Sequence, residues 1–204
     1  MRKAIFCCLF LLSIQPAMAE DFKGKFMLSV KAGHVYLLEN HVIKPALFGS
    51  RIDYFIRDWI SVGLDMNYIE YNEEGPSRFA QYYGAQSELG PEWRWYSLTL
   101  SGKLGLDTTR FSPFFKIGFG FYIPQEIYHR YTNSDVLSTV TTVKVYGKTC
   151  PGYNLGMGLQ YWIWKRFGLQ LEGTIDHIFN RAKQISSARS FTFANLNAGL
   201  SIIF

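Results

Sequence analysis

The chain has 204 residues, of which 48% are hydrophobic and 17% aromatic, and it carries 21 basic against 16 acidic side chains. This small positive excess does not indicate a nucleic-acid partner. Three cysteines, two of which are the adjacent Cys7 and Cys8, exclude a disulfide-rich scaffold. Composition and charge therefore argue against a nucleic-acid-binding protein and a disulfide-rich scaffold, but they do not indicate what the protein is. The two ends of the chain are more informative.

The first 19 residues have the pattern of a cleavable secretory signal peptide. Arg2 and Lys3 precede an apolar run at 4–14, and Ala17-Met18-Ala19 forms a small-residue cleavage site before Glu20. The run is too short for a membrane-spanning helix, which needs about 20 apolar residues. We therefore expect export through the Sec pathway and a mature domain of residues 20–204, whose single cysteine, Cys150, has no partner for a disulfide and no evident role.

Apolar and polar residues alternate with a period of two through the mature chain, which is typical of β-strands with two different faces. In residues 96–106, for example, Tyr96, Leu98 and Leu100 alternate with polar neighbours. No segment after the signal is a long apolar helix. The pattern predicts eight strands, with ends uncertain by about two to four residues, at roughly 24–38, 45–57, 59–71, 96–106, 113–123, 153–163, 169–179 and 195–204.

The connections between these strands are alternately short and long. Short ones are expected at 57–58, 107–112 and 164–166, which places both termini on the side of the short turns, as in an antiparallel up-and-down transmembrane barrel. A ten-stranded barrel is the less favoured alternative, in which 78–89 and 136–148 both cross the membrane. The long connections are expected near 39–44, 72–91, 124–151 and 181–190, and that at 124–151 is predicted to form a β-hairpin above the membrane.

The last eight residues, NAGLSIIF, resemble the terminal sorting signature of bacterial outer-membrane barrels. Asn197 is its polar position, Gly199 its glycine, Ile202 its apolar position and Phe204 its terminal aromatic residue. In that family the last strand turns alternate apolar residues to lipid and presents the terminal aromatic side chain at the membrane interface. The resemblance implies recognition by the barrel-assembly machinery during insertion.

The whole mature chain is similar to the eight-stranded barrels of the OmpA-like transmembrane and OmpX- and OmpW-like group, in its architecture and in glycine-aromatic segments such as FFKIGFGFY and NLGMGLQYW. This resemblance implies a monomer in the outer membrane of a Gram-negative bacterium, in contact with membrane lipid and lipopolysaccharide. It also implies a structural or surface-interaction role, with an extracellular or host ligand bound through the loops. Two alternatives stay open, namely lateral uptake of small hydrophobic molecules and modification of lipid A.

Eight strands enclose an interior that side chains just fill, so we expect a filled polar lumen and no open pore. Because unpaired charge in such a space is costly, the charged side chains that alternation directs inward are expected to form an ion-paired network. A selective proton or ion path is the alternative. The predicted network has four residues of each sign: Lys31, Arg51, Lys103, Lys116, Asp53, Asp65, Glu172 and Asp176.

The sequence predicts no catalytic residue, cofactor or metal site. In the lipid A deacylase family a His-x-Ser pair lies on the outer face of a late strand, whereas His177 here is followed by Phe179, so the strand supplies no hydroxyl beside the histidine. Asp176 is expected to point to the opposite face. The other histidines, His34, His41 and His129, have no metal-ligand spacing. We therefore expect a protein that is not an enzyme.

The last long connection contains Arg181, Lys183 and Arg189 and no acidic residue. These side chains are expected to contact lipopolysaccharide phosphates, although a solvated basic loop is an equally good interpretation. The five tryptophans lie near strand ends, as in an aromatic girdle at the membrane interfaces. Strict alternation, however, points several of them inward, so they carry little weight in the prediction: Trp59, Trp93, Trp95, Trp162 and Trp164.

Overall fold

The computed structural model describes residues 22–37, 42–73, 92–105, 110–134, 137–179 and 190–204. The expected signal segment at 1–19 lies outside these ranges, and so do the three basic residues of the last connection. All the regular elements in the described ranges are β-strands. No helix in these ranges is long and apolar enough to cross a membrane.

The described residues form nine strands, most of which are longer than predicted, although the first is shorter than the predicted 24–38. They begin and end as follows: β1 Phe26–Leu37, β2 Val42–Arg57, β3 Ile60–Glu73, β4 Glu92–Gly105, β5 Phe111–Ser134, β6 Leu137–Tyr146, β7 Cys150–Trp162, β8 Phe167–Phe179 and β9 Ser190–Ile203.

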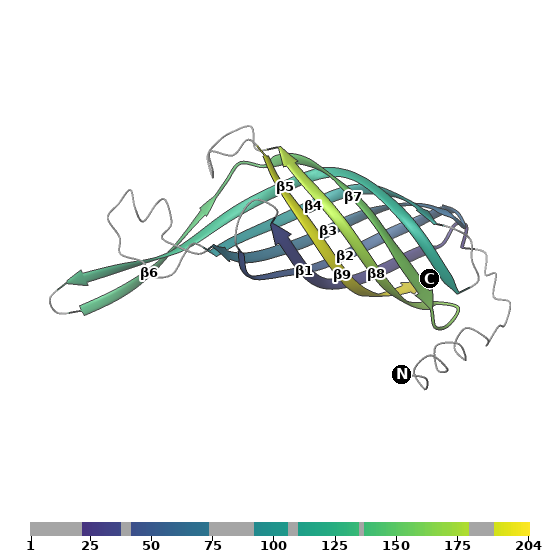
Figure 1. Cartoon of the computed structure of the whole chain (residues 1–204), viewed down its shortest axis with the longest axis horizontal. Helices are drawn as coiled ribbons and strands as arrows, with labels where there is room; N and C mark the ends of the chain where they lie inside the picture. The colour runs from purple at the N-terminus through teal and green to yellow at the C-terminus, as the bar shows by residue number, and fades with distance from the viewer. Residues whose placement is uncertain (1–21, 38–41, 74–91, 106–109, 135–136, 180–189) are drawn as a thin grey trace, which may run out of the picture.

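Eight of these strands form a closed antiparallel barrel (Figure 1). Each barrel strand pairs with the next along the chain, and β1 pairs with β9 from Met27↔Ile203 to Leu37↔Phe193, which closes the wall. The predicted eight-stranded barrel is confirmed. The ten-stranded alternative is wrong at 136–148, because β6 pairs with an extension of β5 and does not enter the wall; its other segment, 78–89, lies outside the described residues.

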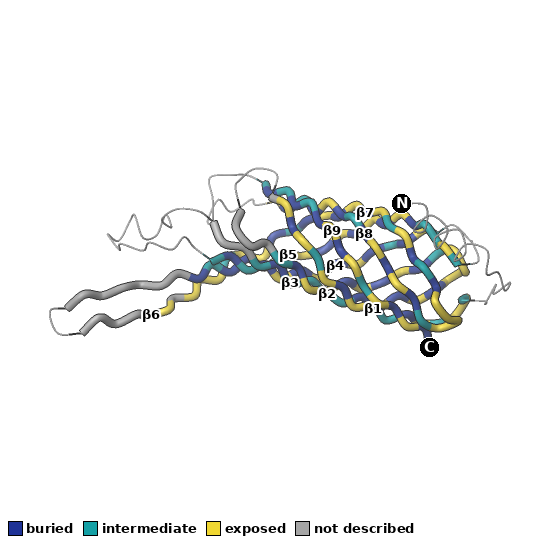
Figure 2. The backbone as a smooth tube through the Cα atoms, turned by 60° about the horizontal axis from the view of Figure 1, so that its bottom comes forward, coloured by how far each residue is buried: buried dark blue, intermediate teal, exposed yellow. Residues whose placement is uncertain are grey.

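The predicted β-hairpin is formed by β6 and the outer part of β5. The first part of β5 pairs with β4 as far as Glu92↔Ile127 and with β7 as far as Tyr122↔Cys150. Its outer part pairs with β6 from Gln125↔Tyr146 to Ser134↔Leu137. Figures 1 and 2 show this hairpin extending well beyond one end of the barrel, which we call the hairpin end.

The opposite end, which we call the terminal end, contains the C-terminus and the short turns. A two-residue turn at Asp58 and Trp59 joins β2 to β3, and a bend at 163–166 joins β7 to β8. Phe26 and Phe204 exchange backbone hydrogen bonds of 3.1 and 3.0 Å, so the start of β1 and the end of the chain lie side by side. Gly24 turns the preceding segment back under the barrel at a φ of 78°, which suits glycine because the residue has no Cβ.

Buried and exposed residues alternate along every wall strand (Figure 2). The outward side chains are mostly large and apolar, as on Ile117, Leu100 and Met157, which are 56%, 61% and 69% exposed. This is the surface that a lipid bilayer requires of a barrel wall. The tryptophans do not form a girdle: Trp93, Trp95 and Trp162 are buried in the lumen, whereas Trp59 and Trp164 are exposed because they lie in the turn and the bend that join strands.

Candidate functional site

The middle of the lumen contains a connected set of buried ion pairs, which we call the charged layer. Asp65 on β3 is one of its two centres. The Asp65 carboxylate lies 3.1 Å from Lys31 Nζ, 3.1 Å from Arg51 Nη1 and 3.7 Å from Lys116 Nζ, and it accepts a hydrogen bond of 2.7 Å from Ser101 Oγ. Arg51 and Asp65 are register partners on adjacent strands, so the alternation of β2 and β3 brings them together directly.

Glu172 on β8 is the second centre. Its Oε1 lies 2.5 Å from Lys116 Nζ and 3.4 Å from Lys31 Nζ, and its Oε2 accepts a hydrogen bond of 2.7 Å from Gln170 Nε2. Lys31 and Lys116 therefore each contact both Asp65 and Glu172. These shared cations connect β1, β3, β5 and β8 across the interior of the barrel.

Arg51 also forms a bidentate salt bridge with Asp53. Its Nε donates to Asp53 Oδ2 at 2.7 Å and its Nη2 to Asp53 Oδ1 at 2.6 Å, and Ser61 Oγ donates to the same carboxylate at 3.0 Å. This bidentate geometry is the strong form of an arginine–carboxylate contact. Six of the eight charged residues predicted for the lumen thus belong to one connected layer.

The other two, Lys103 and Asp176, lie apart from that layer and from each other. Asp176 accepts hydrogen bonds from Tyr122 Oη at 2.7 Å and from Asn195 Nδ2 at 2.5 Å. Lys103 Nζ donates to Gln160 Oε1 at 2.9 Å and lies 4.0 Å from the centre of the Phe114 ring. Within the described part of the chain neither residue has an ion-pair partner within 4 Å, so polar side chains and a ring replace the expected opposite charges.

An apolar cluster, which we call the outer aromatic cluster, fills the lumen at the hairpin end. Phe191 and Phe193 pack edge-on against Trp95, with both ring centroids 5.6 Å from its own. The expectation of a polar filling does not hold here, because the inward positions at this end carry large apolar side chains. The cluster consists of Val35, Leu47, Ile69, Trp93, Trp95, Tyr122, Cys150, Ile178, Phe191 and Phe193.

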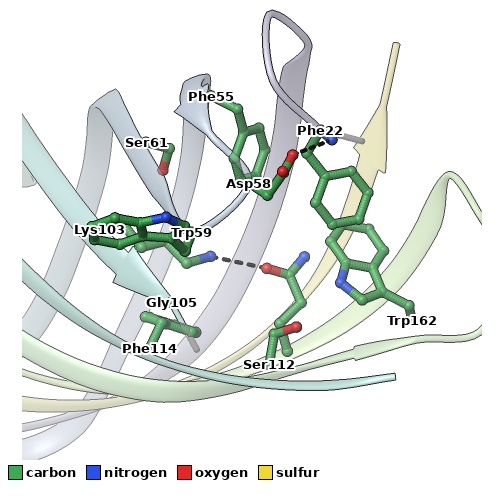
Figure 3. Close-up of a pocket in the computed structure, with 11 residues that line it drawn as sticks. Phe22, Phe55, Asp58, Trp59, Ser61, Lys103, Gly105, Ser112, Phe114 and Trp162 are labelled. Atoms are coloured by element: carbon green, nitrogen blue, oxygen red, sulfur yellow. Dashed lines mark hydrogen bonds between the residues drawn. The ribbon is translucent and has the colours of Figure 1, made fainter. Parts of the chain in front are cut away.

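A second apolar cluster, the inner cluster, fills the terminal end and consists of Met27, Phe55, Trp162 and Ile203, with Phe22 packed against it. The Phe22 ring lies 5.5 Å from that of Phe55 and 5.2 Å from that of Trp162. The backbone N–H groups of Phe22 and Lys23 donate to Asp58 Oδ1 at 2.7 and 3.0 Å, which holds the N-terminal segment under the barrel (Figure 3). The charged layer therefore lies between two apolar layers.

His177 has a hydroxyl partner that the sequence analysis missed. Its Nδ1 lies 3.0 Å from Oγ1 of Thr192, its register partner on β9, and the Tyr153 and Phe179 rings pack beside it. As expected, β8 itself supplies no hydroxyl beside His177, because Phe179 occupies the same-face position; the partner comes from the neighbouring strand, which the sequence analysis did not consider. Asp176 is buried in the lumen, on the opposite face. Among the residues described, no group of three metal-binding side chains occurs.

The residues of the terminal signature lie on both faces of β9. Asn197 is buried in the lumen and Gly199 faces the same way, where an added Cβ would lie 2.6 Å from the Val30 carbonyl oxygen. Ile202 and Phe204 are exposed on the outer wall. The Phe204 ring stacks on that of Phe26 at the terminal end, with a centroid distance of 6.4 Å.

Comparison with protein families matches residues 4–204 to the outer membrane protein beta-barrel domain. Among solved structures, Neisserial surface protein A superposes with a TM-score of 0.57 at 15% identity, over 87% of this chain and 96% of that one. The attachment invasion locus protein Ail of Yersinia pestis, in complex with the heparin analogue sucrose octasulfate, gives 0.52 at 14% identity, over 89% and 99%. No curated protein sequence matches this chain. At these identities the structural likeness concerns the fold alone.

Proposed function

This chain belongs to the family of outer membrane protein β-barrel domains, and we propose that it is a non-enzymatic barrel with a closed lumen that acts through the surface it presents outside the cell. The protein is located in the outer membrane. We propose that residues 1–19 are removed on export and that residues 20–204 form the mature barrel, inserted by the assembly machinery, which would meet Phe204 and the rest of the terminal signature.

The observation that carries the proposal is the layered filling of the lumen. Arg51, Asp65 and Glu172 of the charged layer are at most 2% exposed, and Trp95 and Phe193 of the outer aromatic cluster at most 1%. A solute would have to break the buried ion pairs and displace the packed rings, both of which are costly. The filling supports a structural role for the lumen rather than a diffusion pore.

The β5–β6 hairpin supports a role at the cell surface. It projects from the end opposite the C-terminus (Figure 1), which is the extracellular end in barrels of this family. Function in a rigid scaffold is usually carried by the segments that leave it. Two proteins with the same fold, a neisserial surface protein and a Yersinia attachment protein, provide the analogy for binding an extracellular or host ligand.

The test removes the hairpin and keeps the barrel. Ile127 and Lys144 are register partners, so replacing residues 128–143 by an Asn-Gly turn should close the hairpin just above the wall. We expect this variant to assemble normally but to lose binding of expressing bacteria to host cells and to heparin-coated surfaces. In planar bilayers neither protein should give a stable large conductance. Such a current in the intact protein, or undiminished binding by the shortened variant, would contradict the proposal.

We also propose that Arg181, Lys183 and Arg189 contact lipopolysaccharide phosphates beside the wall. Guanidinium and ammonium groups bind phosphate strongly where they are partly desolvated. The triple alanine variant should gain less thermal stability from added lipopolysaccharide than the original protein does. An equal gain in both proteins would exclude the contact.

The His177–Thr192 pair favours one second candidate, modification of lipid A. A histidine and a hydroxyl at 3.0 Å provide the base and the nucleophile of an acyl transfer. Purified protein incubated with lipopolysaccharide would then release fatty acid, detected by mass spectrometry. Release would have to disappear in His177→Ala and in Thr192→Val, while Thr174→Val, which alters a hydroxyl inside the lumen, would keep it. No release from the original protein excludes this candidate.

A further inference from the structure

A small cavity of about 30 Å³ lies within the terminal end of the barrel (Figure 3). Its apolar walls are formed by the rings of Phe55, Phe114 and Trp162, and Phe22 closes it on the side of the N-terminal segment. Lys103 enters it from β4. The cavity holds one or two groups of the size of a water molecule, which also suits a halide ion.

Lys103 brings a positive charge that the surrounding contacts do not neutralise. The residue is 6% exposed, and one of its three N–H groups donates to Gln160 Oε1 at 2.9 Å. The Phe114 ring, 4.0 Å from Nζ, gives the weaker stabilisation of a cation–π contact. No carboxylate among the described residues lies within 4 Å of Nζ, in contrast to Lys31 and Lys116.

Trp162 brings a hydrogen-bond donor without an acceptor. The residue is 8% exposed, and its Nε1 is buried with no hydrogen-bond partner in the described protein. In Figure 3 this nitrogen faces the interior of the cavity, toward the side from which Lys103 enters. A buried N–H without an acceptor is costly, so its direction into a cavity indicates an occupant that accepts hydrogen bonds.

Among the other polar residues that line the cavity, Gln160 and Asp58 each use an acceptor oxygen within the protein, and Ser61 Oγ donates to Asp53 Oδ1 at 3.0 Å. Gln160 uses its oxygen for Lys103, and its Nε2 reaches only the weakly accepting sulfur of Met27 at 3.3 Å. Asp58 lines the cavity as well, but its Oδ1 accepts from the Phe22 and Lys23 backbone N–H groups. The buried charge of Lys103 and the unpaired N–H of Trp162 favour an occupant that is negatively charged and accepts hydrogen bonds.

We propose that this cavity is a binding site for a small inorganic anion of halide size, held between Lys103 Nζ and Trp162 Nε1 with Gln160 Nε2 as a further donor. The anion balances Lys103, which among the described residues is the lumen cation outside the charged layer. It also connects β4 to β7 beneath that layer, at the end of the barrel that faces the periplasm.

The direct test uses bromide as the probe. Crystals of the purified mature barrel grown in sodium bromide should give an anomalous difference peak within hydrogen-bond distance of Lys103 Nζ and Trp162 Nε1. In detergent solution, ³⁵Cl NMR of the same protein should show an excess line width that bromide removes by competition. Density for water alone, with no anomalous peak and no excess line width, would overturn the proposal.

Three variants assign the site to its residues. Lys103→Met, which keeps the length of the side chain, should abolish the excess line width, and Trp162→Phe, which removes the indole N–H together with part of the ring, should weaken binding about tenfold or more. Lys165→Met removes an exposed lysine at the same end and should change nothing. Heat-modifiable migration in gels verifies that each variant has folded. Unchanged binding in folded Lys103→Met would also overturn the proposal.

Discussion

Two groups of ion pairs in this barrel have similar distances between nitrogen and oxygen atoms, but their side chains differ strongly in exposure. In the charged layer, the ion pairs of Asp65 and Glu172 are 2.5 to 3.7 Å long, and the side chains involved are at most 6% exposed. On the outer wall near the hairpin end, Arg94 lies 2.5 Å from Glu92 and 3.8 Å from Glu70, and these side chains are 23% to 38% exposed. We call the second set the wall group.

The comparison shows that distance alone does not determine what an ion pair contributes. A charge of the wall group that loses its partner can still be hydrated or reach a lipid headgroup, so its pair contributes little. A charge of the charged layer has no such alternative, because the apolar clusters at both ends keep water out. Its loss of a partner leaves a buried charge uncompensated, which costs several kcal/mol.

The largest effect is expected for Asp65→Asn. The change removes the negative charge shared by Lys31, Arg51 and Lys116 and should lower the free energy of unfolding by about 3–5 kcal/mol. Urea titration of the protein refolded into lipid vesicles, followed by tryptophan fluorescence, measures this difference. The matched change in the wall group, Glu92→Gln, should cost at most about 1 kcal/mol. Equal losses in both variants would refute the distinction between the two groups.

An intermediate effect is expected from filling space inside the lumen beside Asn197. A Cβ added at Gly33, which faces the lumen, would lie 2.2 Å from the Leu196 carbonyl oxygen, whereas one added at Gly102, on the outer wall, meets nothing within 4 Å. Gly33→Ala should therefore lower the free energy of unfolding by about 1–3 kcal/mol through overpacking. Gly102→Ala should leave it unchanged or raise it slightly. The same urea titration compares them, and an unaffected Gly33→Ala would mean that the packing around Asn197 adapts easily.

The alternation of residues was sufficient to predict the wall and the charged layer. Arg51, Asp53 and Asp65 face inward because their positions have the same parity as their buried neighbours, and no knowledge of pairing was needed. The outer aromatic cluster was missed for a different reason. Its residues Phe191 and Phe193 precede the predicted start of the last strand, and the inward parity of Trp93 and Trp95 was recognised but given little weight.

Contacts between strands could not be predicted, because they depend on register. Thr192 lies 15 positions after His177 in the sequence, and only the pairing of β8 with β9 makes them neighbours. The placing of Phe22 beneath the barrel depends likewise on the turn at Asp58. In a barrel, one residue of slippage reverses the face of every side chain, so the parity of a strand is well determined by its hydrophobic pattern while its exact partners are not.

The smallest effect is expected for Arg94→Met in the wall group. Methionine keeps most of the length of the side chain and leaves Glu70 and Glu92 near the membrane surface, where a lost ion pair costs at most about 1 kcal/mol. Glu70 also keeps its hydrogen bond from Tyr68 Oη. The identical substitution at Arg51 removes the partner of two buried carboxylates and should cost about 3 kcal/mol or more.

Urea titration of the two variants at 0.05 and 0.5 M salt adds a second criterion, because screening acts on exposed charges. The small cost at Arg94 should shrink as salt rises, and the cost at Arg51 should stay constant. A cost at Arg51 that fell with salt would mean that water and ions reach the charged layer, and the closed lumen would have to be abandoned.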